Sequence, residues 1–258
     1  MSLTLVAFMT VSLYLLATVL QGMLLICFTR KIKTAVLILS VVAVILHAIL
    51  LHLWIDHAAG QNLSFANLFS FTAWLITVMV FIFSLRKSIE SLFLLVFPVC
   101  ALSIAFVLLS SQKNMVNTIA EPITLFHIIL SEVAFCVLSI AGLLAILLAA
   151  QECCLRYKKM LGIMSQLPAV ESMEAFLFQV IYCGFILLSI VLISSIYFYY
   201  DLLWTRYDVL QKALLVTLAW IVFAWLLIGR HYMGWRGRKA INGTLFAVLL
   251  LFISYFGF

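Results

Sequence analysis

Long apolar stretches separated by short polar connections follow one another along the whole chain. Each stretch reaches roughly the 20 residues that a helix needs to cross the hydrocarbon core of a bilayer. None alternates between apolar and polar residues as a barrel strand does, and in lipid a continuous segment must satisfy its own backbone hydrogen bonds. The pattern therefore predicts an all-α integral membrane protein, a bundle of eight transmembrane helices over about residues 3–28, 35–55, 65–85, 89–109, 123–150, 175–199, 210–229 and 240–257.

The composition supports this fold class. Hydrophobic residues make up 67% of the 258 residues and charged residues 9%, whereas soluble domains are roughly half apolar and a quarter charged. A soluble fold with this composition would expose apolar side chains over most of its surface. The composition also excludes a disordered chain, a disulfide-stapled secreted module and a nucleic-acid-binding protein. Because the connections are short, we expect a single transmembrane domain over residues 1–258.

The distribution of Lys and Arg predicts the orientation. Cytoplasmic loops of membrane proteins carry an excess of basic residues. One set of alternate connections holds twelve: Arg30, Lys31, Lys33, Arg86, Lys87, Arg156, Lys158, Lys159, Arg230, Arg236, Arg238 and Lys239. The other set holds three: Lys113, Arg206 and Lys212. We therefore expect the first set in the cytoplasm and both termini outside. The first span lacks a basic start and a cleavage site, so we interpret it as a retained helix.

Ionisable residues are costly inside a bilayer, so those within the spans are functional candidates. His47 lies in the second span among aliphatic residues, where a ligand role and a hydrogen-bonded structural role both stay open. His127 lies about one turn into the fifth span, behind Pro122, where a cofactor at the outer surface would reach it. The alternative is a histidine that only bonds a nearby polar group. Glu132 is expected to be a neutral acid bonded to a neighbouring helix.

Two further segments leave alternatives open. The connection at 199–208, which includes Trp204, is rich in aromatic residues and would either hold a planar ligand or lie on the bilayer. The adjacent Cys153 and Cys154 would bind a metal, carry an acyl group or simply be small residues at a helix end. No nucleophile elbow, Walker A, HExxH or dinucleotide-binding motif is present, which favours a non-enzymatic protein without deciding the point.

Several segments resemble the CcsA-type cytochrome c assembly family, and the resemblance covers nearly the whole chain. Arg230, the Gly-Trp-Arg-Gly-Arg run at 234–238 and the Tyr-Phe-Gly at 255–257 occur in the order found in that family. Supporting similarities are His127 followed by Ala134-Phe135, and Asn67-Leu68-Phe69-Ser70 followed by Trp74. Within the family, the YpjD/HemX-like branch is suggested by Leu167-Pro168, Met173-Glu174 and Phe178.

The resemblance implies a haem site at the outer face of the bundle, in a bacterial inner membrane. It makes His127 a ligand of the haem iron and His47 a candidate for the family's intramembrane histidine. It also makes Lys212 the lysine that closes the tryptophan-rich loop, of which this chain keeps only Trp204. Two histidines of the family are missing: Ile228 stands at the position of one, and none follows the Tyr-Phe-Gly at 255–257.

Three functions are therefore compared. The first is a haem-binding or haem-handling protein in cytochrome c biogenesis, whose partners would be the lipid bilayer, haem and other membrane assembly proteins. The second is a non-enzymatic accessory or scaffold protein that has lost its haem ligands. The third is an ion-transport accessory that uses Glu132 and the buried histidines. The resemblance places the haem-handling function first.

Overall fold

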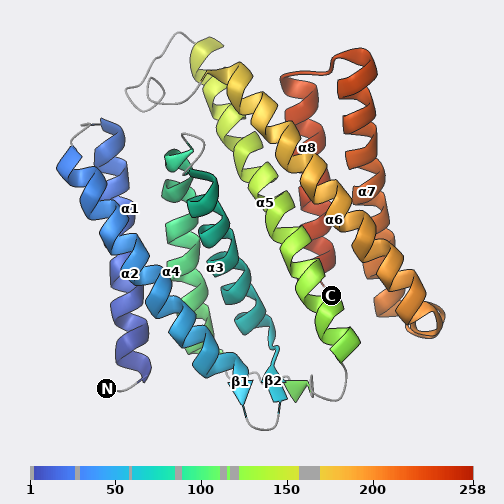
Figure 1. Ribbon diagram of the computed structural model, residues 1–258, viewed down its shortest axis with the longest axis horizontal. Coiled ribbons are helices and arrows are strands. Elements are labelled where there is room, and N and C mark those ends of the chain that lie inside the picture. The colour runs from blue at the N-terminus through green and yellow to red at the C-terminus, as the bar shows by residue number, and fades with distance from the viewer. Residues whose placement is uncertain are drawn as a thin grey trace. The chain divides into compact units, whose positions relative to one another are not determined.

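The structure is a computed structural model that describes residues 3–26, 30–57, 60–84, 89–110, 115–116, 122–156 and 169–257. Over these residues eight α-helices are long and apolar enough to cross a membrane, which confirms the predicted fold class. Figure 1 shows the elements in chain order: α1 (Leu3–Ile26), α2 (Arg30–Ile55), β1 (Asp56–His57), β2 (Gly60–Asn62), α3 (Phe65–Ser84), a 3₁₀ turn η1 (Glu90–Leu92), α4 (Phe93–Leu109), β3 (Met115–Val116), α5 (Pro122–Arg156), α6 (Val170–Thr205), α7 (Tyr207–Met233) and α8 (Arg238–Phe256).

The helices form two compact units. We call Met1–Pro122 with Met160–Leu167 the N-terminal unit, and Ile123–Lys159 with Pro168–Phe258 the C-terminal unit. The first contains α1 to α4 and the three strands, and the second contains α5 to α8. The placement of both termini on the outer side and the grouping of all eight helices into a single domain stay predictions.

Several helices extend beyond the predicted apolar stretches. A helix can continue past the hydrocarbon core, because its polar side chains are in contact with water there. Helix α5 runs on through the polar segment 151–156, and α6 begins at Val170, five residues before the predicted span. The aromatic segment 199–208 is not the long connection that we predicted. A kink at Tyr199 (φ −124°, ψ 23°) redirects α6, which continues to Thr205, and Arg206 alone separates it from α7.

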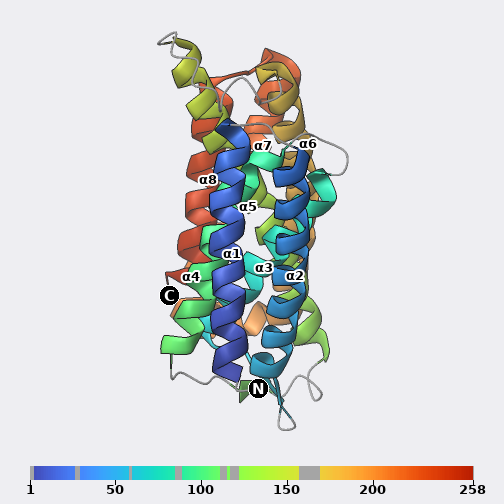
Figure 2. The same cartoon turned by 90° about the vertical axis from the view of Figure 1, so that its left-hand side faces the viewer.

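In the N-terminal unit, α1 packs between α2 and α4, and α3 packs on α2 and α4. Figure 2, which looks onto α1, shows α2 and α4 on either side of it. Buried alanines at Ala7, Ala17 and Ala43 allow close approach of the helices, as small residues do in membrane bundles. The rings of Phe93 and Phe97, both buried, stack at 5.0 Å between centroids.

A small antiparallel sheet, absent from the predicted all-α fold, lies at the end of the N-terminal unit where α1 begins (Figure 1). Strand β2 pairs with β1 through Asp56–Gln61 and His57–Gly60, and with β3 through Gln61–Val116 and Asn62–Met115. The sheet connects α2 to α3 and ties the segment after α4 to that connection.

In the C-terminal unit, α7 packs on α6 and α8. The turn between α7 and α8 carries the Gly-Trp-Arg-Gly-Arg run. Gly234 ends α7 in the left-handed conformation (φ 64°), which glycine adopts without steric cost. The ring of Trp235 then folds back onto Gly229, where any Cβ atom would overlap it. The run is therefore a turn that Gly234 permits, and Gly229 on α7 leaves room for the tryptophan.

Candidate functional site

His127, the predicted haem ligand, lies half-buried on the first turns of α5 in the C-terminal unit. Its Nδ1 atom is 2.9 Å from the hydroxyl of Ser194 on α6. The Ser194 hydroxyl also lies 2.9 Å from the carbonyl oxygen of Val191, to which it donates its single proton. The serine oxygen therefore accepts from the imidazole, and this network assigns the histidine proton to Nδ1.

This tautomer leaves the Nε2 lone pair of His127 as the basic position of the ring. Among the residues that the structure describes, Nε2 takes no hydrogen bond. A histidine that binds a metal through one nitrogen usually donates the proton on the other nitrogen to an oxygen acceptor, which fixes its tautomer and ring orientation. His127 has this arrangement in the protein alone, because Ser194 accepts the proton on Nδ1.

Aromatic and hydroxyl side chains flank His127. The Tyr199 ring lies 5.2 Å from the imidazole, centroid to centroid, and is tilted by 59°. The Tyr199 hydroxyl donates to Thr124 Oγ1 at 3.1 Å, which fixes the ring across α5 at the kink of α6. The kink thus positions an aromatic surface beside the candidate ligand.

Trp204 and Lys212 do not contact His127 in the described interactions. Trp204 is 70% exposed, and its described ring contact is Tyr200, 6.3 Å away. Lys212 lies in the second turn of α7, where its backbone carbonyl accepts a hydrogen bond from Ser254 at 3.1 Å. Both residues lie near the α6–α7 junction, and their predicted roles at a haem stay predictions.

Glu132, deeper in α5, is buried and shares a side-chain hydrogen bond with Tyr255 on α8. The Tyr255 ring stacks on Phe135 at 4.5 Å. The expected bond from this acid to a neighbouring helix is therefore confirmed. The Tyr-Phe-Gly at the end of the chain provides that bond.

His47 is fully buried in the N-terminal unit, and both its ring nitrogens are engaged. Nδ1 is 3.2 Å from the Tyr14 hydroxyl on α1, and Nε2 is 2.9 Å from the Ser70 hydroxyl on α3. A metal would have to displace one of these hydrogen bonds. The structure therefore favours the structural role that the sequence left open, while a ligand role for His47 stays a prediction.

The hydrogen bonds of His47 extend into a buried polar network. Ser103 on α4 lies 3.5 Å from Ser70, and Cys100, one turn away, contacts Thr77 at 2.9 Å. A side-chain hydrogen bond between Cys100 and Tyr14 closes the network back onto α1. Side chains from all four helices of the unit thus hydrogen-bond to one another within the bundle.

The Asn67, Ser70 and Trp74 side chains lie on one face of α3, because their spacing of three and four residues matches the helical repeat. All three bond to α2: Asn67 Nδ2 donates to the Trp54 carbonyl at 3.3 Å, Ser70 bonds His47, and Trp74 Nε1 donates to the Val44 carbonyl at 3.0 Å. The motif that resembled the family's third-span pattern is therefore the polar face by which α3 holds α2.

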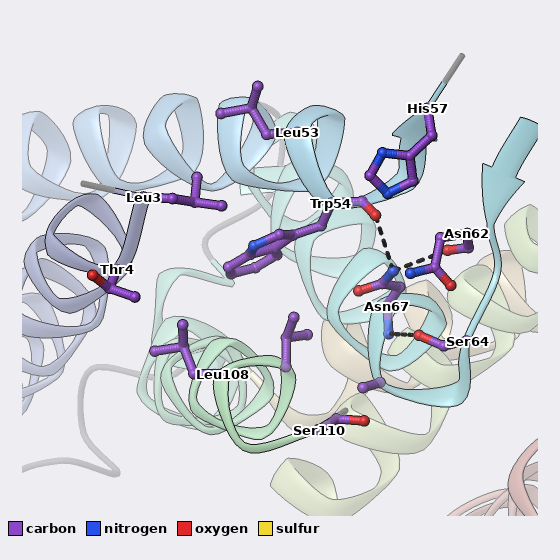
Figure 3. Close-up of a pocket in the computed structure, with 12 residues that line it drawn as sticks. Leu3, Thr4, Leu53, Trp54, His57, Asn62, Ser64, Asn67, Leu108 and Ser110 are labelled. Atoms are coloured by element: carbon purple, nitrogen blue, oxygen red, sulfur yellow. Dashed lines mark hydrogen bonds between the residues drawn. The ribbon is translucent and has the colours of Figure 1, made fainter. Parts of the chain in front are cut away.

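A pocket of about 380 Å³ opens at the strand-bearing end of the N-terminal unit (Figure 3). Apolar side chains form one wall and polar side chains the other. Its lining residues are Leu3, Thr4, Leu53, Trp54, His57, Asn62, Ser64, Ala66, Asn67, Val107, Leu108 and Ser110. The sequence did not predict this pocket, because it depends on how four helix ends and two strands meet.

Arg230 and Glu174 form an ion pair at the other end of the C-terminal unit. Arg230 Nη1 lies 2.5 Å from Glu174 Oε1 and also donates to the Trp235 carbonyl at 3.1 Å. Glu174 Oε2 accepts from the Gly237 backbone at 3.3 Å, and the Arg230 guanidinium lies 4.7 Å from the Phe178 ring centre. Two markers of the family resemblance, Arg230 and Glu174, therefore fasten the α7–α8 turn to α6.

The residues of the C-terminal unit would provide one ligand to a haem iron. Neutral imidazole with its second nitrogen hydrogen-bonded is a suitable iron ligand, and His127 provides it. His231, the other histidine of this unit, lies at the opposite end, in the last turn of α7. No group of three His, Cys, Asp or Glu residues that could hold a bare metal ion occurs in the described part of the chain.

Comparisons with known proteins agree on one family. The family model described as cytochrome C assembly protein matches residues 34–258. The chain is 30% identical over 223 residues to inner membrane protein YpjD of Escherichia coli K12, an alignment that covers 86% of this chain and 84% of the relative. Relatives with the same name from the O6:H1 and O157:H7 strains match equally well. No solved structure matches the chain.

Proposed function

The chain belongs to the cytochrome c assembly protein family, and from this premise we propose that its C-terminal unit binds haem through His127. Family membership supports a role in cytochrome c biogenesis. The eight membrane-spanning helices, together with inner-membrane relatives, make the chain a multi-pass inner membrane protein. The family model covers parts of both units, which supports treating residues 1–258 as one functional domain.

The observation that carries the proposal is the hydrogen bond between His127 Nδ1 and Ser194. It directs the ring proton away from Nε2, so the ring needs no rearrangement before Nε2 binds iron. The Tyr199 ring beside it would supply apolar contact to a planar macrocycle. The bound haem would supply the iron, while the chain's own residues would hold the imidazole in one orientation and cover one side of the site.

The half-buried position of His127 also suits a protein that hands haem on. A fully buried ligand would require the helices to separate for every transfer, whereas a site near a helix end exposes part of the group it binds. We propose that Trp204 and Lys212, at the α6–α7 junction, lie on the path between this site and an outer partner. His47 supports the fold of the N-terminal unit in this proposal.

Haem titration of the purified full-length chain tests the proposal. Wild type in detergent should develop a Soret band that saturates at one haem per chain. His127→Gly should lose the band, and added imidazole should restore it because a free imidazole can occupy the vacated position. His231→Ala, which removes the histidine at the opposite end of the same unit, is the matched control and should titrate like wild type.

Two outcomes would contradict haem binding at His127. A wild-type chain that shows no Soret band with ample haem would leave the accessory-protein function as the better explanation. A His127→Gly variant that binds haem as well as wild type would place the ligand elsewhere in the chain.

A further inference from the structure

We infer that the pocket at the strand-bearing end of the N-terminal unit is a binding site for an uncharged amphipathic molecule whose head donates a hydrogen bond, that is, a lipid-soluble alcohol or phenol. The site involves neither His127 nor the C-terminal unit, so it does not rest on the proposed haem function.

One polar side chain of the pocket lining is Asn67, which is only 3% exposed. Its Nδ2 atom faces two carbonyl oxygens, those of Trp54 at 3.3 Å and Asn62 at 2.9 Å. Both neighbours are acceptors, so the nitrogen of the carboxamide must face them and the oxygen must face the other way. The orientation of the amide is therefore fixed by the end of α2 and by β2.

The Oδ1 atom of Asn67 is left as an acceptor. It accepts no hydrogen bond from the described ranges of the chain, although both amide protons are used. Figure 3 shows this oxygen directed into the space between the Trp54 ring and Leu108. Because Asn67 lines the pocket, this oxygen can accept a hydrogen bond from a ligand whose head donates a proton.

The opposite wall is apolar and continuous with the lipid-facing surface. Leu53 and Leu108 line it together with the Trp54 ring, and Leu3 and Leu53 are themselves exposed on the outside of the unit. A ligand with an apolar tail could therefore enter from the bilayer while its head reaches Asn67. The volume of about 380 Å³ lies in the range of small-molecule pockets, roughly 300 to 1,000 Å³.

The lining restricts the charge of the head. None of the lining residues is an aspartate, glutamate, lysine or arginine, and His57 is the one histidine among them. A charged head would lose hydration without a fixed counter-charge. Two membrane components share the required chemistry, a glycerolipid with a free hydroxyl and a hydroquinone, and the experiment distinguishes them.

The test uses the full-length chain in phosphatidylcholine nanodiscs and a monoacylglycerol with a photoreactive diazirine in its acyl chain. After irradiation, labelled peptides are mapped by mass spectrometry. Labelling should concentrate on the ends of α2 and α4 that line the pocket. Unlabelled decanoylglycerol should suppress it at about tenfold lower concentration than its dimethyl ether, because the ether cannot donate to Asn67.

A pair of variants tests the location. Leu108→Trp fills the pocket and should abolish the specific labelling. Leu109→Trp adds the same side chain at the next position, which is 86% exposed and outside the lining, and should label like wild type. Asn67→Ala should erase the preference for the alcohol over the ether. If that variant does not fold, the comparison of alcohol with ether and the two tryptophan variants still test whether the ligand binds in this pocket.

Decylhydroquinone as a second competitor identifies the source of the ligand. Suppression at lower concentration than decanoylglycerol assigns the site to a quinol, and the reverse order assigns it to a glycerolipid. Equal competition by alcohol and ether, equal labelling of the two tryptophan variants, or labelling spread evenly over all lipid-facing helices would each overturn the inference.

Discussion

His47 and His127 both lie within membrane-spanning helices, but the two units of the molecule use them differently. His47 is fully buried among four helices, with one ring nitrogen bonded to Tyr14 and the other to Ser70. His127 is half-buried near the end of α5, with only Nδ1 bonded, to Ser194. The first histidine cannot bind a further group without losing an interaction, and the second can.

The comparison shows that depth in the membrane alone does not identify a functional histidine. An ionisable residue inside a bilayer is a candidate because burial without a partner is costly. At His47, hydrogen bonds to hydroxyl groups on two neighbouring helices offset this cost. The number of engaged nitrogens therefore separates a residue that stabilises the fold from one that is positioned to bind.

The largest expected effect is on the stability of the N-terminal unit. His47→Ala leaves the Tyr14 and Ser70 hydroxyls without their partner and creates a cavity, so we expect a loss of about 3 kcal/mol in unfolding free energy. Denaturant unfolding in detergent measures it. His52→Ala, which removes an exposed histidine from the end of the same helix, is the control. A His47→Ala variant as stable as wild type would contradict the structural role of His47.

The C-terminal unit should depend on its ion pair in the way that the N-terminal unit depends on its histidine. Glu174→Gln removes the charge that faces Arg230, where the Glu174 side chain is 7% exposed. Because an uncompensated and largely buried charge remains, we expect a loss of about 2 to 3 kcal/mol. Asp208→Asn breaks the exposed pair with Arg206 and should leave the unfolding free energy unchanged. Equal effects of the two substitutions on the unfolding free energy would argue against a stabilising role for the Arg230–Glu174 ion pair at the α7–α8 turn.

The smallest expected effect concerns the orientation of His127. Ser194→Ala removes the acceptor of the Nδ1 proton and should weaken haem binding about tenfold, because outer partners of metal-bound histidines have effects of about 10- to 100-fold. Ser189→Ala removes another α6 hydroxyl, which accepts from Trp220 at 2.8 Å, and should leave haem affinity unchanged. Nitrogen-15 NMR of the haem-free chain should show His127 protonated at Nδ1 in wild type, and protonation at Nε2 would contradict the assignment.

The transmembrane spans could be predicted because the bilayer imposes them. A segment in lipid has to be apolar and helical over a fixed length, and both properties are visible in the sequence. The helix ends could not be predicted, because α5 and α6 continue into polar residues, where hydropathy does not indicate whether the chain is helical. The two-residue strands β1 and β3 were missed because they are too short to show an alternating pattern.

The candidate site was predictable only in part. His127 could be selected because a histidine inside a span is rare, and the family resemblance pointed to the same residue. Ser194 could not be selected, because it is 67 residues away in the sequence and no sequence pattern links it to His127. Asn67 belongs to a family-like motif that is visible in the sequence, but its fixed orientation depends on backbone carbonyls at the ends of α2 and β2.

The contrast between the two histidines is tested most directly by the haem content and the unfolding free energy of His47→Ala and His127→Ala, measured side by side on purified full-length protein. The account predicts that His127→Ala loses haem and keeps near-wild-type stability. It predicts that His47→Ala loses stability and keeps one haem per folded chain. The reverse result, with haem lost from His47→Ala and stability lost from His127→Ala, would contradict the account.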